Sequence, residues 1–286
     1  MILITGATGR TGHQAALDLA AKGCAVRALV RNADKAAVLK EAGVDLLFGD
    51  AADATAVDRA MKGINRLIII LPNGEQQLAN EKNLVDRALA NGIRHILKVS
   101  SIEANAGAIN PIHHMHFESE QHIRRTGIPW TFVRPSFYMQ NFLASAATVR
   151  AESKLRFPFA ERGAAVLTDA DDVGHFIAEV ISAGDHGNQS YDITSGDKLR
   201  FSEVAEVFGD VLGRRIEYVA EDPVAYRARL GRFLTNQWHL DAVCDLFAEI
   251  ADGYVGETSD DFRRIMGREP TSLREFVARH RQAFAA

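Results

Sequence analysis

Three glycines, each three residues after the one before, follow an apolar run at the start of the chain. Residues 1–5 read MILIT, and the glycines lie in the GATGRTG segment of residues 6–12. Apolar side chains then recur at helical spacing over residues 11–22, so the glycines separate a predicted strand from a predicted helix. In that context Gly6 allows a sharp turn, Gly9 the approach of a pyrophosphate, and Gly12 close packing of helix on strand. We predict a dinucleotide-binding turn whose helix N-terminus favours phosphate charge; a tight turn without a ligand is the alternative.

The first half of the chain alternates short apolar runs with helix-like stretches. The apolar runs, read as strands, are residues 1–5, 25–30, 45–48, 66–71, 95–99 and 130–133. The helix-like stretches are residues 11–22, 34–41, 54–61, 77–90 and 117–125. Continuous apolar strands that alternate with helices are typical of a buried parallel sheet. The pattern predicts an α/β fold with a doubly wound parallel sheet.

The second half of the chain breaks this alternation. Its expected strands are residues 164–167, 190–193 and 215–219. Its expected helices are residues 171–182, residues 202–212 with Ser202 as N-cap, and most of residues 224–250. Residues 271–275 resemble the capping start of a last helix. We expect residues 1–135 to form a nucleotide-binding core. Residues 136–286 are expected to supply mainly a substrate-binding lid, with part of this chain returning to the core, and the whole to form one compact unit.

Composition excludes several classes of protein. Lys and Arg total 33 against 37 Asp and Glu, a formal charge of -4, which argues against a nucleic-acid partner. The longest apolar stretch, residues 67–71, is far shorter than the ~20 residues of a membrane span, and a first strand at Met1 predicts no signal peptide. Cys24 and Cys244 form no metal or disulfide pattern, so we expect a reducing, cytoplasmic location. The sequence does not determine the oligomeric state, and a homodimer is compatible with it.

The end of the second predicted strand bears on the choice of cofactor. An NAD site usually has an acid about 20 residues past the glycines, which binds the ribose 2′-hydroxyl. Here the strand ends in Arg31 and Asn32 instead, and a guanidinium suits a 2′-phosphate. Arg10 in the glycine segment could assist. This favours NADPH over NADH, although the nearby Asp34 keeps NADH open; two solvated arginines are the alternative.

Three other predicted strand ends offer walls for a nucleotide cleft, since ligands of open parallel sheets lie at the carboxyl ends of the strands. Asp50 follows the third strand and suits a hydrogen bond to an adenine amino group, with a turn or helix-cap aspartate as the equal alternative. Residues 71–73 (Leu71, Pro72 and Asn73) end the fourth strand, and Ser100 follows the fifth.

Five stretches together resemble the NmrA-like group of atypical short-chain dehydrogenases. They are Ile4-Thr5-Gly6-Ala7-Thr8-Gly9, Val30-Arg31-Asn32, Gly49-Asp50, His116-Phe117-Glu118-Ser119-Glu120 and Ile128-Pro129-Trp130-Thr131-Phe132-Val133-Arg134-Pro135. The resemblance covers nearly the whole chain and is greatest to group members that reduce quinones and triphenylmethane dyes with NADPH. It implies a Rossmann-type core, a smaller C-terminal α+β substrate-binding portion, and NADP binding by the glycine turn and Arg31.

The chain lacks the Tyr-x-x-x-Lys pair of ordinary short-chain dehydrogenases. Relatives similar to isoflavone reductase keep a lysine in this region, and counting back from residues 127–129 aligns that lysine with His116. His116 is therefore the candidate proton donor or hydrogen-bonding group. We expect His113 and His114 to lie on an exposed loop after Pro111, and we expect no metal, because no third ligand accompanies the histidines.

A missing tyrosine matters least for acceptors that are already electrophilic and delocalise the charge they gain. Residues 136–142 follow the sixth strand and contain Phe137, Tyr138, Asn141 and Phe142, which could bind a flat acceptor. Packing in the core of the lid is the alternative for each ring, and Tyr138 is a second candidate proton donor. The residues expected at the cofactor are Gly6, Thr8, Gly9, Arg10, Thr11, Gly12, Arg31, Asp50, Leu71, Pro72, Asn73, Ser100, His116, Pro135 and Phe137.

Two functions follow from the resemblance. The first is an NAD(P)H-dependent oxidoreductase that transfers a hydride from NADPH to a small quinone-like, azo or triphenylmethane-dye-like acceptor, with His116 and Tyr138 as catalytic residues. The second is a non-catalytic regulator that senses the NADP redox state and binds a protein partner, since such relatives also lack the tyrosine and the lysine. The aromatic segment at residues 137–142 favours the enzyme.

Overall fold

The contacts of the chain divide it into two compact units. The computed structural model describes residues 1–160, 163–252 and 256–285. The first unit consists of Met1–Pro135 and Ala170–Asp192, and the second of Ser136–Asp169 and Ile193–Ala286. Each unit buries an apolar cluster of its own. The chain leaves the first unit after Pro135 and returns to it for one helix and most of one strand.

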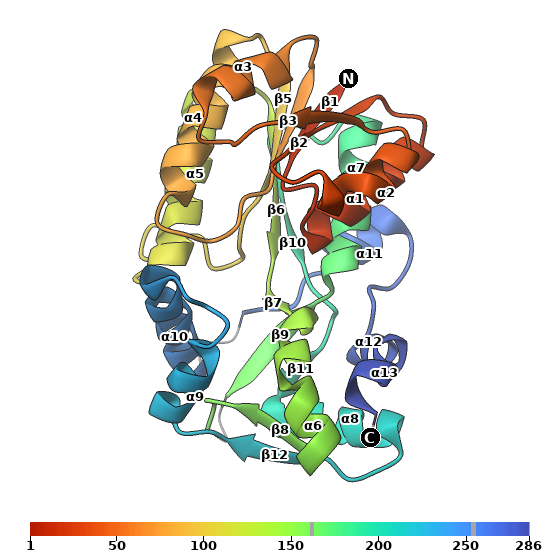
Figure 1. Ribbon diagram of the computed structural model, residues 1–286, viewed down its shortest axis with the longest axis vertical. Helices are drawn as coiled ribbons and strands as arrows, with labels where there is room; N and C mark the ends of the chain where they lie inside the picture. The colour runs from red at the N-terminus through yellow and green to blue at the C-terminus, as the bar shows by residue number, and fades with distance from the viewer. Residues whose placement is uncertain (161–162, 253–255, 286) are drawn as a thin grey trace. The chain divides into compact units, whose positions relative to one another are not determined.

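A seven-stranded sheet forms the centre of the first unit (Figure 1). Its strands are β1 (Ile2–Thr5), β2 (Val26–Val30), β3 (Asp45–Phe48), β4 (Arg66–Ile69), β5 (His95–Val99), β6 (Trp130–Pro135) and β10 (Gln189–Ile193). They lie in the order β10-β6-β5-β4-β1-β2-β3, and β1 to β6 pair in parallel. The strand order reverses between β1 and β4, the point where ligands bind in open parallel sheets. The predicted doubly wound Rossmann-type fold is confirmed.

Helices cover both faces of this sheet. Figure 1 shows α3, α4 and α5 on one face and α1, α2 and α7 on the other. Their bounds are α1 (Arg10–Ala21), α2 (Ala37–Glu41, after the 3-10 turn η1, Asp34–Ala36), α3 (Ala54–Met61), α4 (Gln77–Ala90), α5 (Pro111–Arg125) and α7 (Ala170–Ala183). Leu67, Leu84 and Phe132 are fully buried in the apolar cluster between strands and helices. Burying each such side chain contributes about 1.5–3 kcal/mol.

Helix α7 packs against α1 with almost no space between the two backbones. A Cβ on Gly174 would lie 2.6 Å from the Cβ of Gln14 and 2.9 Å from the carbonyl oxygen of Thr11. At the edge of this contact, Nδ1 of His175 lies 2.5 Å from Oδ2 of Asp18. The returning segment of chain therefore braces the helix that begins at the glycine turn.

The predicted start of α5 and the predicted serine N-cap of the helix near residue 202 were wrong. Helix α5 begins at Pro111 rather than at residue 117, because Asn110 caps it by accepting the N–H of Ile112 at 3.0 Å and proline suits a first helical turn. Helix α8 (Phe201–Leu212) begins before Ser202, and its N-cap is Arg200. The strand expected at 215–219 is β12 (Glu217–Ala220), and the stretch 224–250 forms two helices, α9 (Pro223–Leu230) and α10 (Gln237–Ala251).

The described residues of the second unit form two small sheets. In one, β9 (Ala164–Thr168) pairs antiparallel with β11 (Lys198–Arg200) and parallel with β7 (Phe137–Tyr138). In the other, β12 pairs parallel with β8 (Lys154–Phe157). Its remaining elements are η2 (Met139–Ser145), α6 (Ala146–Glu152), α11 (Asp261–Met266), α12 (Leu273–Arg279) and α13 (Arg281–Phe284). Ser272 and Glu275 form the capping box of α12, which confirms the predicted start of that helix.

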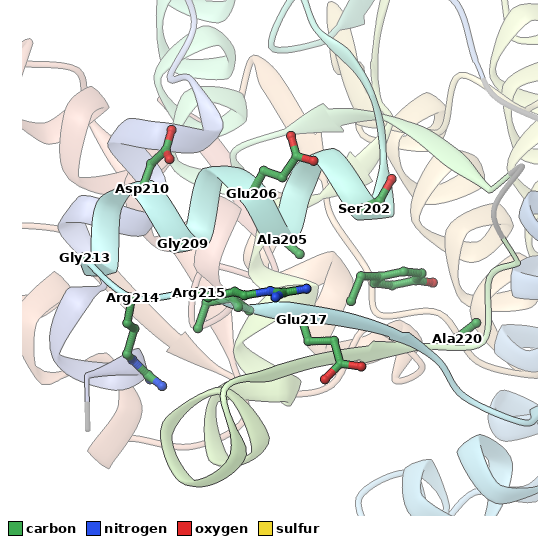
Figure 2. A pocket seen from close by; sticks show the side chains of 12 residues that line it. Ser202, Ala205, Glu206, Gly209, Asp210, Gly213, Arg214, Arg215, Glu217 and Ala220 are labelled. Atoms are coloured by element: carbon green, nitrogen blue, oxygen red, sulfur yellow. The ribbon is translucent and has the colours of Figure 1, made fainter.

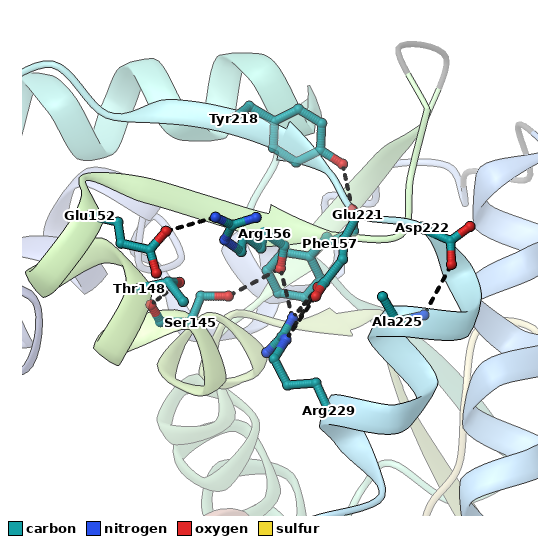
Figure 3. Close-up of polar contacts among 10 residues, drawn as sticks. All are labelled: Ser145, Thr148, Glu152, Arg156, Phe157, Tyr218, Glu221, Asp222, Ala225 and Arg229. Atoms are coloured by element: carbon teal, nitrogen blue, oxygen red, sulfur yellow. Dashed lines mark hydrogen bonds and ion pairs between the residues drawn. The ribbon is translucent and has the colours of Figure 1, made fainter.

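Aromatic rings fill the core of the second unit, and polar contacts close its edge. The ring of Phe157 lies 5.6 Å from that of Phe142 and 5.5 Å from that of Phe201, measured between centroids. Figure 3 shows the polar edge, where Arg229 pairs with Glu221 at 2.7 Å and also donates to the carbonyl oxygen of Arg156. These contacts connect β8 to the segment between β12 and α9. Within the described ranges, no helix has both the length and the apolar character that crossing a membrane requires.

Candidate active site

The glycine turn after β1 is closed so tightly that two of its glycines leave no room for a side chain. Gly6 has a φ of 67°, and a Cβ there would lie 2.2 Å from the carbonyl oxygen of Ile70. A Cβ on Gly12 would lie 2.3 Å from the carbonyl oxygen of Gly6. Gly9 is less confined, since its Cβ would lie 3.3 Å from the same oxygen, to which its N–H donates at 2.9 Å. The sharp turn and the close packing that the motif predicts are both present.

Helix α1 begins at this turn without a side chain to cap it. Gly9 is the N-cap, its backbone is extended, and it offers no side chain to accept the first N–H groups. The N–H of His13 donates to the carbonyl oxygen of Gly9 at 2.8 Å and closes the first helical turn. Thr8 and Arg10 are exposed, whereas Thr11 is buried. N–H groups in the first turn of a helix lack intrahelical acceptors and carry partial positive charge, so this end suits an anion.

Thr5 joins the end of β1 to the end of β4. Its hydroxyl oxygen accepts the N–H of Ile70 at 3.0 Å. The segment predicted as a cleft wall follows immediately, with Leu71 half-buried against the core, Pro72 exposed and Asn73 half-buried. These residues therefore lie next to the glycine turn, at the point where the strand order reverses.

Arg31 and Asp50, predicted from two different strand ends, lie beside each other. Arg31 follows β2, Asp50 follows β3, and these strands pair in parallel. Nη1 of Arg31 is 3.8 Å from Oδ2 of Asp50, and both side chains are largely exposed, so the ion pair itself is worth about 0–1 kcal/mol. Oδ1 of Asp50 accepts the N–H of Ala52 at 2.9 Å, which is the turn role given above as the alternative to an adenine contact. Asp34, the acid that left NADH as an alternative cofactor in the sequence analysis, is the first residue of η1.

Ser100, at the end of β5, is a buried residue whose hydroxyl has no hydrogen-bond partner among the described residues. Its backbone N–H donates to the carbonyl oxygen of Val133 at 2.7 Å, so the residue itself is fixed. Leaving a buried hydroxyl unpaired costs about 1–3 kcal/mol. A ligand at this sheet edge could supply the missing partner.

His116 lies on α5 within a buried group of ionisable side chains. Its Nδ1 is 3.0 Å from Nζ of Lys98, which lies on β5. Lys98 Nζ also contacts both carboxylate oxygens of Glu81 on α4, at 3.0 Å and 2.9 Å, and donates to the carbonyl oxygen of Val99 at 3.1 Å. The side chains of Lys98 and Glu81 are 0% and 1% exposed. We call these three side chains, Glu81, Lys98 and His116, the buried triad.

The surroundings of His116 keep its ring neutral. Burial, followed by the positive charge of Lys98 and by His113, holds the pKa of His116 well below its ordinary value of 6.5. A lysine ammonium group donates and never accepts, so it occupies the lone pair of Nδ1. The lowered pKa also argues against His116 acting as an imidazolium acid at neutral pH.

The expectation of an exposed loop was wrong for the two neighbouring histidines. Both lie on the first turns of α5, because that helix begins at Pro111. His113 is buried, its Nε2 lies 3.9 Å from Oε2 of Glu103, and burial lowers its pKa to about 4. His114 alone of the two is exposed.

Lys98 and Glu81 were missed by the sequence analysis, although each leaves a signal. Lys98 interrupts the apolar run of β5, where charged residues are rarely buried without a partner. Glu81 falls on the same helical face as the buried Gln77, Leu84 and Val85 of α4. Gln77 donates to the Glu81 carboxylate at 3.1 Å, which extends the polar group along that face.

The residues predicted to bind the acceptor belong to the second unit. Phe137 and Phe142 lie in its aromatic core, 5.7 Å apart between ring centroids, and Phe142 is fully buried. Core packing, the alternative given above, therefore describes both rings. Tyr138 is half-buried and Asn141 is exposed, so these two retain surface for a ligand. Pro135 is the last residue of β6 and of the first unit's first segment.

Two grooves of the described chain lie away from these residues. One, of about 820 Å³, runs between α8 and β12 in the second unit, and Figure 2 shows Glu206, Asp210, Arg215 and Glu217 among its lining. The other, of about 500 Å³, lies at the amino ends of the strands in the first unit and is lined by Arg66, among others. Neither contains a residue predicted for the cofactor, the acceptor or catalysis.

Comparison with known proteins finds relatives and solved structures of the full length. The chain is 29% identical over 287 residues to NAD(P)H azoreductase from Xenophilus azovorans, with 100% of each protein covered. It is 26% identical to quinone oxidoreductase 2 from Escherichia coli, covering 97% of this chain and 98% of the relative. The crystal structure of Citrobacter sp. triphenylmethane reductase complexed with NADP(H) aligns with a TM-score of 0.86 at 25% identity, covering 99% of this chain and 100% of that one.

A family description matches over the same span. The model of the NmrA-like family covers residues 1–276, nearly the whole chain. The resemblance inferred from the five sequence stretches is confirmed, since the matched residues include the glycine turn, the buried triad and most of the second unit. The chain belongs to the NmrA-like family.

Proposed function

We propose that this protein is an NADPH-dependent reductase that transfers a hydride to a small aromatic acceptor of the quinone, azo or triphenylmethane-dye type. The relatives' names support the reaction class, because they describe an NAD(P)H azoreductase, a quinone oxidoreductase and a triphenylmethane reductase. The glycine turn carries the proposal for this chain. Its geometry excludes side chains at Gly6 and Gly12 and leaves the start of α1 uncapped.

The residues of the first unit fit a dinucleotide at this turn. The uncapped N-terminus of α1 suits the pyrophosphate, with the exposed Thr8 and Arg10 beside it. Arg31 is exposed at the end of β2, where its guanidinium suits a 2′-phosphate, and Asp50 lies beside it. The unpartnered hydroxyl of Ser100 and the segment at residues 71–73 would line the same sheet edge.

Bound NADPH would supply the hydride, and the chain's own residues would orient the reactants and stabilise the charge that the acceptor gains. His116 is near the carboxyl end of β5, since Lys98 bonds both its ring and the carbonyl oxygen of Val99. Its Nε2–H can donate to an oxygen or nitrogen of the acceptor or of the cofactor amide. Quinones and dyes delocalise the added electrons, so a neutral donor suffices where a ketone would need a stronger acid. A quinone or azo acceptor then takes a proton from water, whereas a cationic triphenylmethane dye becomes neutral with the hydride alone.

For the acceptor we propose contacts with Tyr138 and Asn141. Both belong to the segment that follows β6 directly, and both retain accessible surface, unlike Phe142. The phenol of Tyr138 offers a flat face and a hydroxyl to a flat acceptor. We also propose a cytoplasmic location, supported by Cys24 and Cys244, which are free thiols.

Calorimetry and an absorbance assay of NADPH consumption test the proposal together. We expect tight NADPH binding and NADPH oxidation with at least one of three panels: simple quinones, azo dyes and triphenylmethane dyes. Tight binding with no oxidation by any panel would overturn the enzyme and favour a sensor of the NADP redox state. Absence of binding by either nicotinamide dinucleotide would overturn both.

A further inference from the structure

We propose that Lys98, anchored by Glu81, is a positioning residue that holds His116 in its Nε2–H form and makes it a hydrogen-bond donor in place of a base. The role of His116 in turnover rests on the proposed function. The state of its ring does not, and it can be measured in the protein without cofactor or acceptor.

The three N–H bonds of the Lys98 ammonium group have three acceptors. They are Oε1 of Glu81, the carbonyl oxygen of Val99 and Nδ1 of His116, at 3.0–3.1 Å. The three donors of the lysine ammonium group thus match three acceptors one to one. The bond to Nδ1 is therefore part of a saturated arrangement, and it determines which ring nitrogen carries the proton.

The Glu81 carboxylate offsets the free-energy cost of burying the Lys98 ammonium group. Burying a lone charge is costly, and an adjacent carboxylate offsets that cost. Gln77 donates to the Glu81 carboxylate at 3.1 Å from the preceding turn of α4 and so fixes its position. Strand β5, helix α4 and helix α5 thus each supply one member of the triad, and rigid elements hold all three.

The charge of the group bonded to Nδ1 determines whether His116 acts as a base or as a hydrogen-bond donor. A carboxylate on Nδ1–H would raise the basicity of Nε2, as in a Ser-His-Asp triad. Here a cation donates to Nδ1, which withdraws electron density from the ring and strengthens Nε2–H as a donor. Protonating Nδ1 would place two cations 3.0 Å apart, so the imidazolium form is excluded at neutral pH. His116 is 7% exposed, and within the described chain no group bonds its Nε2, which leaves that donor for a ligand.

The ring state can be measured by long-range ¹H–¹⁵N correlation NMR of ¹⁵N-labelled protein without cofactor, with the His116→Gln variant assigning the signals. We expect one tautomer, with Nδ1 unprotonated and Nε2 protonated, unchanged between about pH 5.5 and 8, the range in which an ordinary histidine titrates. The charged or titratable groups that act on the ring are Lys98 on β5 and His113 on α5, and Glu81 on α4 is bonded to Lys98. An Nδ1–H tautomer, a mixture of the two, or titration within that range would overturn the proposal.

Variants test whether Lys98 is the cause. In Lys98→Met, and in the charge-balanced double variant Glu81→Gln/Lys98→Met, we expect a mixture of tautomers and a higher His116 pKa. The double variant keeps the test valid if the single one does not fold, since it leaves no buried charge unpaired. Lys40→Met, a change of the same kind at an exposed site on α2, is the control and should leave the ring unchanged. Unchanged tautomers in the double variant would show that Lys98 does not determine the ring state.

Turnover provides a separate measurement. With an acceptor found by the assay above, the double variant should lower kcat roughly tenfold with little change in the KM for NADPH, and kcat should acquire a new ionisation as His116 begins to titrate. A loss of kcat that is the same at every pH would point to disturbed folding and would overturn the positioning role. If no acceptor is turned over, the proposed function fails while the NMR result still decides the state of the ring.

Discussion

A Cβ on Gly12 would lie 2.3 Å from the carbonyl oxygen of Gly6, so these two glycines determine each other's backbone. In Gly12→Ala the turn must open, and we expect a loss of about 1–3 kcal/mol in the free energy of unfolding together with loss of NADPH affinity in calorimetry. Gly187→Ala is the matched control, because its Cβ would meet only the side chain of Pro129 at 3.5 Å. Unchanged NADPH affinity in Gly12→Ala would show that the glycine turn does not bind the cofactor.

Arg31 should distinguish the two nicotinamide cofactors. In Arg31→Asp the guanidinium next to Asp50 is replaced by a second carboxylate, so we expect NADPH affinity to fall much more than NADH affinity. Lys35→Asp changes the net charge by the same amount on the following turn and controls for long-range attraction. Equal losses for both cofactors, measured by titration, would show that Arg31 does not bind the 2′-phosphate.

His116→Ala should lower both turnover and stability. Removing one donor from developing charge costs on the order of 100-fold in kcat. The buried Lys98 also loses an acceptor, so the free energy of unfolding in urea should fall by about 1–3 kcal/mol. His114→Ala, at an exposed position of the same helix, should change neither quantity. Wild-type kcat in His116→Ala would remove the residue from the active site.

His95 should make the folded state sensitive to acid. Burial first, then Arg66 and His186, lower its pKa to about 4 from 6.5, so the unfolded chain binds its proton more readily. Stability is then present above about pH 6.5 and is lost as the pH falls toward 4, by about 1–2 kcal/mol between pH 7 and 5 for this group alone. His95→Gln removes the titration and can still donate to Thr131. Its urea unfolding should be less acid-sensitive than that of wild type or of His114→Gln; an equal sensitivity would contradict the assignment.

Tyr138 and His116 are both candidate proton or hydrogen-bond donors, and a conservative change separates them. Tyr138→Phe keeps the ring and removes the hydroxyl, so a fall in kcat of roughly tenfold would assign the hydroxyl to catalysis. Tyr226→Phe, in the buried core of the second unit, is the control. If only KM for the acceptor rises, Tyr138 binds the acceptor and donates no proton.

Local signals in the sequence were sufficient to predict most of the helices and strands of the first unit. Helix α4 was predicted with both of its bounds, because Leu84, Val85 and Ala88 mark one face and Asn91-Gly92 ends it in the conformation that glycine favours. Helix α5 was predicted to start late, because polar histidines were read as a loop. The capping pair Asn110-Pro111 was the stronger signal, and the structure follows it.

The site was less predictable, since its chemistry depends on packing between distant segments. Arg31 and Asp50 were each predicted from a strand end, and only the pairing of β2 with β3 brings them together. Lys98 could not be joined to Glu81, because a strand pattern records burial and does not reveal which helix supplies the opposite charge. The spacing of Phe137 and Phe142 likewise suits a ligand surface and a protein core equally, and only the contacts of the second unit separate the two.

Residues 136–169 belong to the second unit and interrupt the first unit, which has a consequence for synthesis on the ribosome. Until residue 192 has left the exit tunnel, a nascent chain has β6 as an open strand edge and α1 without the helix that Gly174 packs against it. Open edges of this kind recruit other strands, so the nascent chain passes through an aggregation-prone interval. A fragment that stops at Pro135 would remain in that state permanently, which makes the cofactor-binding half of this protein unsuitable for expression as a simple N-terminal truncation.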